Sequence, residues 1–221
     1  MATNQEESAP FRSGEGIHRI GRRVLTLIAS LVIAVTGFVA APASTLQEAS
    51  ASSKRISCAP LAKKVDPAKI PISGGTKKER ALIRKQLKKY AKHTNITSVT
   101  LRGRKGKASG GAQYWQSCGK ITGKTQLWVQ KGRGSKWLTG AITHEIAHAN
   151  QLFVHRGQSM SAIASKFRKR FGGSGTRGLE NGADCAVYSV GQAKKRMPYK
   201  SNCSKKQKQV AKNLLMKGKR L

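Results

Sequence analysis

The chain has 221 residues, a formal net charge of +34 at pH 7 and a pI near 10.9. This charge is far beyond what solubility requires and predicts attraction to a polyanion, such as an anionic cell-wall polymer, lipid head groups or an acidic protein. A compositional bias with no dedicated ligand is the alternative. Only 5% of the residues are aromatic, and no named nucleic-acid motif is present, so sequence-specific nucleic-acid recognition is not expected.

The first 43 residues are typical of a secretory signal peptide. Arg22-Arg23 precede an uncharged run at 24–41, and the small-residue sequence Ala41-Pro42-Ala43 follows. The run is long enough to span a bilayer, so an uncleaved membrane anchor is the alternative. The cleavage pattern favours removal, and the arginine pair permits either general or twin-arginine export. We therefore expect a secreted protein, retained at the cell wall by its charge.

All four cysteines follow the cleavage site, and an even number in a secreted chain predicts two disulfides. Three pairings are possible. We favour Cys58–Cys118 with Cys185–Cys203, because the second bond would fix the C-terminal segment to the helix expected around residue 180. Zinc binding by cysteine is disfavoured, since the chain has no C-x-x-C pair.

The remaining sequence predicts an α+β domain. Residues 44–75 contain three prolines and little periodicity, and so form an irregular lead-in to a domain at 76–221. Thr76 with Glu79 three residues later predicts the start of a helix. The expected elements are helices at 76–91, 161–171 and 205–216, the last strongly basic, and strands at 96–102, 112–117 and 125–130, with glycine-rich connections at 103–111 and 172–178.

Residues 144–148 read His-Glu-Ile-Ala-His, within a helix expected at 138–152. Two imidazoles four residues apart lie one turn apart on the same helical face, so His144 and His148 can bind one metal ion. Glu145 would then face the open position of the metal and accept a proton from water held there.

A second pair of polar residues follows in Glu180-Asn181-Gly182-Ala183-Asp184, again four apart on an expected helix. Glu180 is a suitable third zinc ligand, and Asp184 can accept the free ring N–H of a ligand histidine. After residue 43 only six acidic residues occur, which argues that these are retained for a site: Glu48, Asp66, Glu79, Glu145, Glu180 and Asp184.

These two motifs resemble the gluzincin branch of the zincin metallopeptidases, and especially small secreted bacterial forms with E-x-x-A-D-C, here 180–185. The resemblance covers about 120–190. It implies a minimal zincin-like fold, in which a small antiparallel or mixed sheet packs on the HExxH helix and a glutamate helix. It also implies one Zn²⁺ per chain bound by His144, His148 and Glu180, with Glu145 as general base and Asp184 orienting a ligand. The strand around 127–129 would be the sheet edge that binds substrate. Position 154 is valine, so the metzincin arrangement with a third histidine does not apply.

Three questions stay open at this level. The residue that helps the metal to stabilise an oxyanion is one of Tyr188, Tyr199, His155 and Arg177; Tyr188 would share the helix of Glu180. The substrate is a peptide or protein, or a peptidoglycan cross-link. A non-catalytic protein that binds a polyanion or the cell wall on the same scaffold is the alternative function. A monomer is expected.

Overall fold

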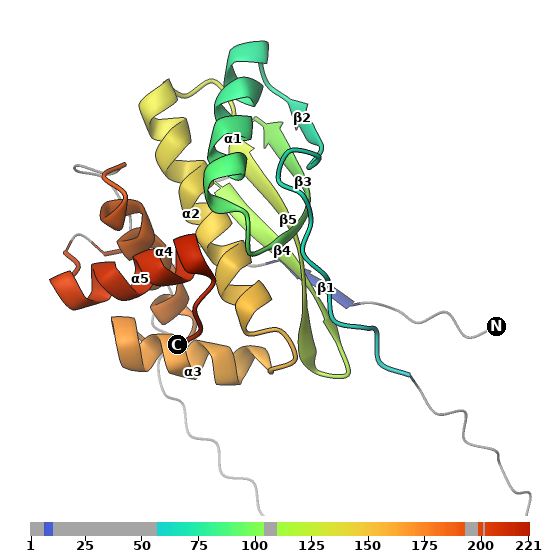
Figure 1. The fold of residues 1–221 in the computed structure, drawn as a ribbon, viewed down its shortest axis with the longest axis vertical. Coiled ribbons are helices and arrows are strands. Elements are labelled where there is room, and N and C mark those ends of the chain that lie inside the picture. Colours follow the sequence, from blue (N-terminus) through green and yellow to red (C-terminus); the bar gives the residue numbers. More distant parts are fainter. Residues whose placement is uncertain (1–6, 11–56, 104–109, 193–198, 201) are drawn as a thin grey trace, which may run out of the picture. The chain divides into compact units, whose positions relative to one another are not determined.

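A mixed β-sheet with the strand order β1-β4-β5-β3-β2 forms one layer of the protein (Figure 1). The computed structural model describes residues 7–10, 57–103, 110–192, 199–200 and 202–221. The strands are β1 (Glu7–Pro10), β2 (Ile72–Gly74), β3 (Asn95–Arg102), β4 (Gly110–Ser117) and β5 (Lys120–Gln130). The helices are α1 (Lys77–Tyr90), α2 (Ser135–Val154), α3 (Met160–Phe171), α4 (Arg177–Ser189) and α5 (Lys205–Lys217).

The sheet contains both pairing directions. β5 pairs antiparallel with β4 and parallel with β3, and β3 pairs parallel with β2. A two-residue turn at Cys118-Gly119 joins β4 to β5, and both residues have positive φ, as a type I′ hairpin turn requires. The α+β class and the mixed sheet are as predicted.

Two expectations about the sheet need correction. The strand around 127–129 belongs to β5, which lies between β4 and β3 and is therefore not an edge. Its hairpin with β4 covers one side and the parallel strand β3 covers the other. Residues 58–75 are not only a lead-in, since they belong to the same structural unit as the rest and Ile72–Gly74 form the edge strand β2.

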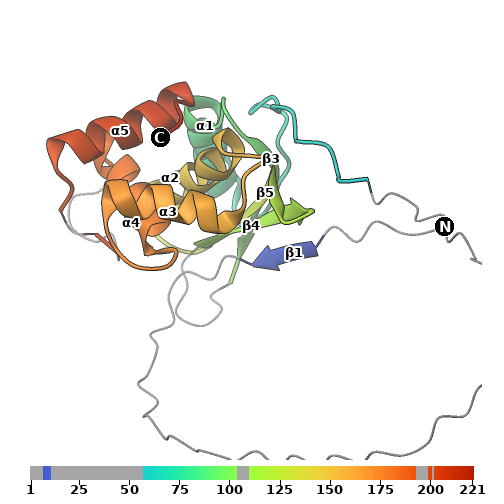
Figure 2. The same cartoon turned by 90° about the horizontal axis from the view of Figure 1, so that it is seen from below.

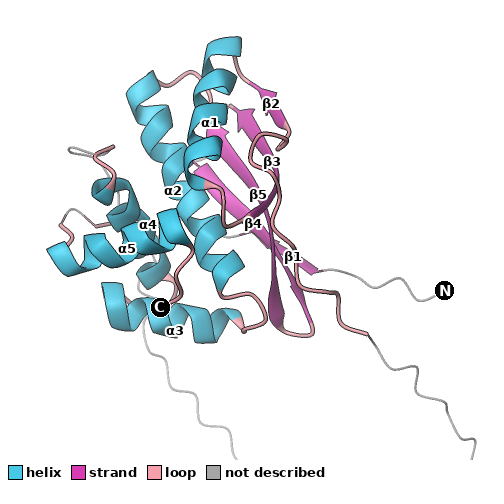
Figure 3. Ribbon diagram, viewed as in Figure 1, coloured by secondary structure: helices cyan, strands magenta, loops and turns pink. Residues whose placement is uncertain are grey.

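The long helix α2 lies against the sheet (Figures 1 and 2). It contains the whole HExxH motif. Leu138, Ile142 and Ile146 are spaced along one face and are at most 1% exposed in the core. Helices α3, α4 and α5 pack together around the C-terminal half of α2, so that α4 faces α2 (Figure 3). The helix is therefore buried on both faces, one by the sheet and the other by α4.

Capping fixes where α1 begins. The hydroxyl of Thr76 accepts the N–H of Glu79, and the Glu79 carboxylate accepts the N–H of Thr76 in return. The second carboxylate oxygen of Glu79 accepts the N–H of Gly132, in the turn between β5 and α2. One glutamate thus connects the start of α1 to the segment that leads into the HExxH helix.

Both disulfides have the pairing that we favoured, Cys58–Cys118 and Cys185–Cys203. The first joins the segment before β2 to the β4–β5 turn, and the second joins α4 to the residue before the N-cap of α5. Of the predicted signal peptide at 1–43, only Glu7–Pro10 belongs to the described residues, where it forms β1 beside β4. Within the described ranges no helix is long and apolar enough to cross a membrane, and the uncharged run at 24–41 lies outside these ranges.

Candidate metal centre

Helix α2 places the two histidines of the HExxH motif on its buried face toward α4. His144 is 6% exposed and His148 is 4% exposed. The four-residue spacing brings their Nε2 atoms to 3.0 Å from each other, with the rings in an edge-to-face arrangement. The pair lies near the middle of α2, where the helix is buried continuously from Ile142 to Val154, so both rings are enclosed by neighbouring elements.

Helix α4 supplies the acidic residues. Glu180 and Asp184 lie one turn apart on α4, 4% and 0% exposed. Gly178 permits the approach of α3, since a Cβ there would come within 2.5 Å of the backbone nitrogen of Arg168. The absence of a side chain at this position lets α4 pack directly against α3 while its acidic face is turned to α2.

Three ligand atoms converge on one point. Glu180 Oε2 lies 3.1 Å from His144 Nε2 and 3.4 Å from His148 Nε2. These three residues are the group of the described chain whose ligand atoms can hold a metal ion. The second carboxylate oxygen of Glu180, Oε1, is buried and has no hydrogen-bond partner among the described residues.

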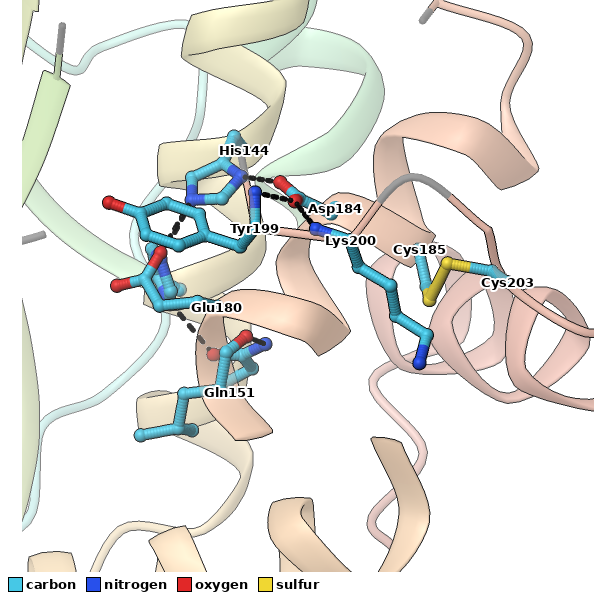
Figure 4. Close-up of polar contacts among 10 residues, drawn as sticks. His144, Gln151, Glu180, Asp184, Cys185, Tyr199, Lys200 and Cys203 are labelled. Atoms are coloured by element: carbon cyan, nitrogen blue, oxygen red, sulfur yellow. Dashed lines mark hydrogen bonds and ion pairs between the residues drawn. A yellow bond between two sulfur atoms is a disulfide. The ribbon is translucent and has the colours of Figure 1, made fainter. Parts of the chain in front are cut away.

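The other ring nitrogen of each histidine is held by an acceptor. His144 Nδ1 lies 2.9 Å from Asp184 Oδ1, and His148 Nδ1 lies 2.9 Å from Gln151 Oε1 (Figure 4). The amide of Gln151 is oriented by its own Nε2, which donates to the carbonyl of Leu179. Each acceptor favours the tautomer of its histidine that carries the proton on Nδ1.

This arrangement has an electrostatic consequence at the centre. In the neutral histidines the Nδ1 protons leave the two Nε2 lone pairs directed at each other and at the Glu180 carboxylate. Three acceptors this close together in a largely buried group require a proton or a metal cation between them. The donor set of two imidazoles and one carboxylate suits a divalent metal.

The ionisation of the group follows from the same contacts. Burial lowers the pKa of His144, but the hydrogen bonds to Asp184 and Glu180 outweigh it and raise that pKa well above the ordinary value of 6.5. Burial alone would raise the pKa of Glu180, yet the charge of His148 and hydrogen bonds to both histidines hold it well below its usual range. Without a metal, a positive charge is thus stabilised at the centre.

Glu145 has a different environment. It is 5% exposed, and burial raises the pKa of its carboxyl group to about 7, with His144 and His148 opposing the rise. Its carboxylate lies against the first residue of β4, because a Cβ on Gly110 would come within 2.4 Å of Glu145 Oε1. A carboxyl group with a pKa near neutrality can both accept and return a proton at working pH.

The four residues considered as oxyanion-stabilising donors lie in different parts of the structure, and not all of them are near the histidines. Tyr188, in the last turn of α4, packs against the hydrophobic core. His155 is buried at the C-cap of α2, where its Nδ1 donates to the carbonyl of Gln151 and its Nε2 accepts the N–H of Leu221.

Tyr199 lies at the centre itself, with its ring stacked on His144 at a centroid distance of 6.1 Å. Arg177 lies over the Tyr199 ring at 4.8 Å.

The structure therefore brings together all five residues of the predicted site, and it adds three contacts that the sequence analysis did not include: Gln151, Gly110 and the backbone of Tyr199. Gln151 follows His148 by three residues, a helical spacing that could have revealed it. Comparisons of this chain with protein-family models, with curated proteins and with solved structures find no significant match in any of the three.

Proposed function

We propose that the protein is a secreted zinc-dependent metallopeptidase with a zincin-like site. The observation that carries the proposal is the buried convergence of His144 Nε2, His148 Nε2 and Glu180 Oε2, with both Nδ1 atoms held by acceptors. A tetrahedral zinc ion with ligands at about 2.0–2.1 Å separates its ligand atoms by about 3.3–3.4 Å. The observed separations of 3.0, 3.1 and 3.4 Å fit that geometry if the ligand atoms move apart slightly when the ion binds.

The protein groups have distinct roles in this proposal. The bound zinc, held by three protein ligands, would supply an acidified water and polarise the scissile carbonyl. Glu145 accepts the proton of the attacking water and returns it to the leaving amine. Asp184 and Gln151 keep the imidazoles in the tautomer that presents Nε2 to the metal.

The substrate strand is proposed to lie along β4. The carboxylate of Glu145 meets this strand at Gly110, and on the other side of β4 from β5 the segment Glu7–Pro10 pairs antiparallel. An extended peptide in the place of β1 would make the same main-chain hydrogen bonds. Removal of the predicted signal peptide at 1–43 would remove β1 and leave this edge free.

The decisive experiment is hydrolysis of a diverse peptide library by the oxidised, secreted protein, with and without a chelator, beside the Glu145→Gln variant. Metal-dependent cleavage that the variant lacks supports the peptidase. A parallel assay on peptidoglycan cross-links distinguishes the peptidase from an amidase with the same ligands. Absence of hydrolysis on both substrates by zinc-loaded protein would reject the enzymatic proposal.

A second candidate, polyanion binding, rests on the surface charge. Among residues 57–103 and 110–192, the acidic side chains outside the site are Asp66 and Glu79, and both are used in turns or caps. Exposed lysines line two helices: Lys77, Lys78, Lys85, Lys88 and Lys89 on α1, and Lys205, Lys206, Lys208, Lys212 and Lys217 on α5. We propose that this surface retains the enzyme on an anionic wall polymer. Salt-sensitive wall binding that Glu145→Gln leaves unchanged would show that retention and hydrolysis are separate.

A further inference from the structure

The segment formed by residues 199–200 and 202–203 includes side-chain and backbone contacts to the candidate metal centre, although no motif in the sequence marks it. Residues 199 and 200 follow α4 in the chain, and Cys203 precedes the N-cap of α5. Figure 4 shows Tyr199 and Lys200 beside Asp184, on the side of the centre where His144 lies. Three kinds of contact, and an additional hydrogen bond from the Lys200 side chain, fix this segment.

The first contact is made through the backbone. Asp184 uses one carboxylate oxygen, Oδ1, for His144 Nδ1 at 2.9 Å. The other oxygen, Oδ2, accepts the main-chain N–H groups of Tyr199 at 2.9 Å and Lys200 at 2.8 Å. Asp184 is fully buried, so these two N–H groups replace the water that would otherwise solvate Oδ2. The orientation of the carboxylate that holds His144 thus depends on the segment.

The second contact is made by the Tyr199 ring. It stacks on His144 with an interplanar angle of 28° and so lies along one face of the imidazole. The third is covalent, because Cys203 is bonded to Cys185, the residue directly after Asp184. Lys200 adds an anchor through Nζ, which donates to the carbonyl of Phe171 at the end of α3.

We infer that Tyr199 is a positioning residue of the metal site, which acts on His144 through its ring and through the Asp184 carboxylate, and that the Cys185–Cys203 disulfide holds it there. The inference rests on the proposed function in one respect, namely that His144 is a metal ligand. It predicts that metal affinity depends on this disulfide and not on Cys58–Cys118, which joins the β4–β5 turn to the segment before β2.

The chain offers matched variants for the test. Tyr199→Phe keeps the ring and the N–H, Tyr199→Ala removes the ring, and Tyr199→Pro removes both the ring and the main-chain donor. The double variant Cys185→Ala/Cys203→Ala releases the segment, and Cys58→Ala/Cys118→Ala removes the other disulfide as a control. Zinc affinity is measured by competition with a chelating dye, and Co²⁺ absorption reports the ligand geometry. Circular dichroism of each metal-free variant establishes that it is folded.

The expected order of zinc affinity follows from the contacts that remain. Tyr199→Phe and Cys58→Ala/Cys118→Ala bind zinc as the parent does. Tyr199→Pro and Cys185→Ala/Cys203→Ala bind about 10–100-fold more weakly, the usual effect of losing the partner that orients a ligand. Tyr199→Ala lies between the two groups, and the weakened variants give a broadened or shifted Co²⁺ spectrum.

Two results separate this inference from the proposed function. If the parent protein binds no zinc, the proposed function is wrong, and the positioning role of Tyr199 falls with it. If the parent binds zinc and Tyr199→Pro binds it equally well with an unaltered Co²⁺ spectrum, the positioning role is wrong while the metal site stands. Because the Tyr199 variants retain both disulfides, this comparison remains decisive even if the cysteine variants fail to fold.

Discussion

The carboxylate of Glu145 on α2 lies against the α-carbon of Gly110 on β4, so that a methyl group at Gly110 would come within 2.4 Å of Glu145 Oε1. The space that the carboxylate occupies exists only because residue 110 has no side chain. This contact joins the HExxH helix to the strand on which we propose that substrate binds.

Gly110→Ala is therefore expected to displace the Glu145 carboxylate and reduce hydrolysis by at least about 10-fold, since misplacing a catalytic group by about 1 Å can cost 100-fold. Zinc content should be unchanged, because the ligand atoms of His144, His148 and Glu180 are not touched. Gly103→Ala is the control, because a Cβ there has no atom of the described residues within 4 Å. Equal activity of the two variants would show that Glu145 does not need this space.

Glu145→Gln keeps the shape of the side chain and removes its basicity. We expect hydrolysis to fall by at least about 100-fold, the usual contribution of a general base, with zinc still bound at about one per chain. Activity against the cleaved library peptide and elemental analysis are measured on the same preparation. A variant that retains both zinc and full activity would assign the proton transfer to another group.

Gln151→Met tests the contact that orients His148. The substitution conserves volume but removes the acceptor that Gln151 offers His148 Nδ1 and the donor that it offers the carbonyl of Leu179. We expect zinc affinity to fall about 10-fold and the free energy of unfolding to fall by about 1–3 kcal/mol, the range for unsatisfied buried polar groups. Dye competition and urea denaturation measure the two effects. Loss of stability with unchanged zinc affinity would show that Gln151 stabilises the fold but does not orient His148 for metal binding.

Glu79 gives a prediction about pH. Its pKa lies below the ordinary value of 4.5, because its carboxylate accepts the N–H groups of Thr76 and Gly132. A lowered folded-state pKa means that these bonds stabilise the fold fully above pH 4.5 and lose this effect as the pH falls through the lower value.

We therefore expect Glu79→Gln to lower the free energy of unfolding by about 1 kcal/mol at pH 7, and by progressively less below pH 4.5. Urea denaturation of the metal-free parent and variant at several pH values measures the difference, and metal-free protein avoids the separate effect of zinc release in acid. A difference that stays constant down to pH 3 would contradict the role of the carboxylate charge.

The sequence could predict the parts of the site that depend on spacing along one helix. The four-residue intervals His144–His148 and Glu180–Asp184 place each pair on one helical face regardless of the rest of the fold. Gln151 obeys the same rule but was missed, because a neutral amide near a histidine carries little chemical signal by itself.

Features that depend on contacts distant in the chain could not be predicted in the same way. The position of β5 inside the sheet follows from the hairpin at Cys118-Gly119 and from parallel pairing with β3, which local periodicity does not encode. In sequence Tyr188 is the stronger candidate of the two tyrosines, because it shares the expected helix of Glu180. Only the backbone contacts of Asp184 and the Cys185–Cys203 disulfide place Tyr199, and not Tyr188, against His144.

The measurement that tests the account most directly is the zinc content of the oxidised, secreted protein, determined by elemental analysis beside His148→Ala. We predict about one zinc per chain in the parent and almost none in the variant, because loss of one of three ligands leaves too few to hold the ion. A folded parent that contains no zinc, or a variant that retains it, would contradict the central claim that His144, His148 and Glu180 form a zinc site.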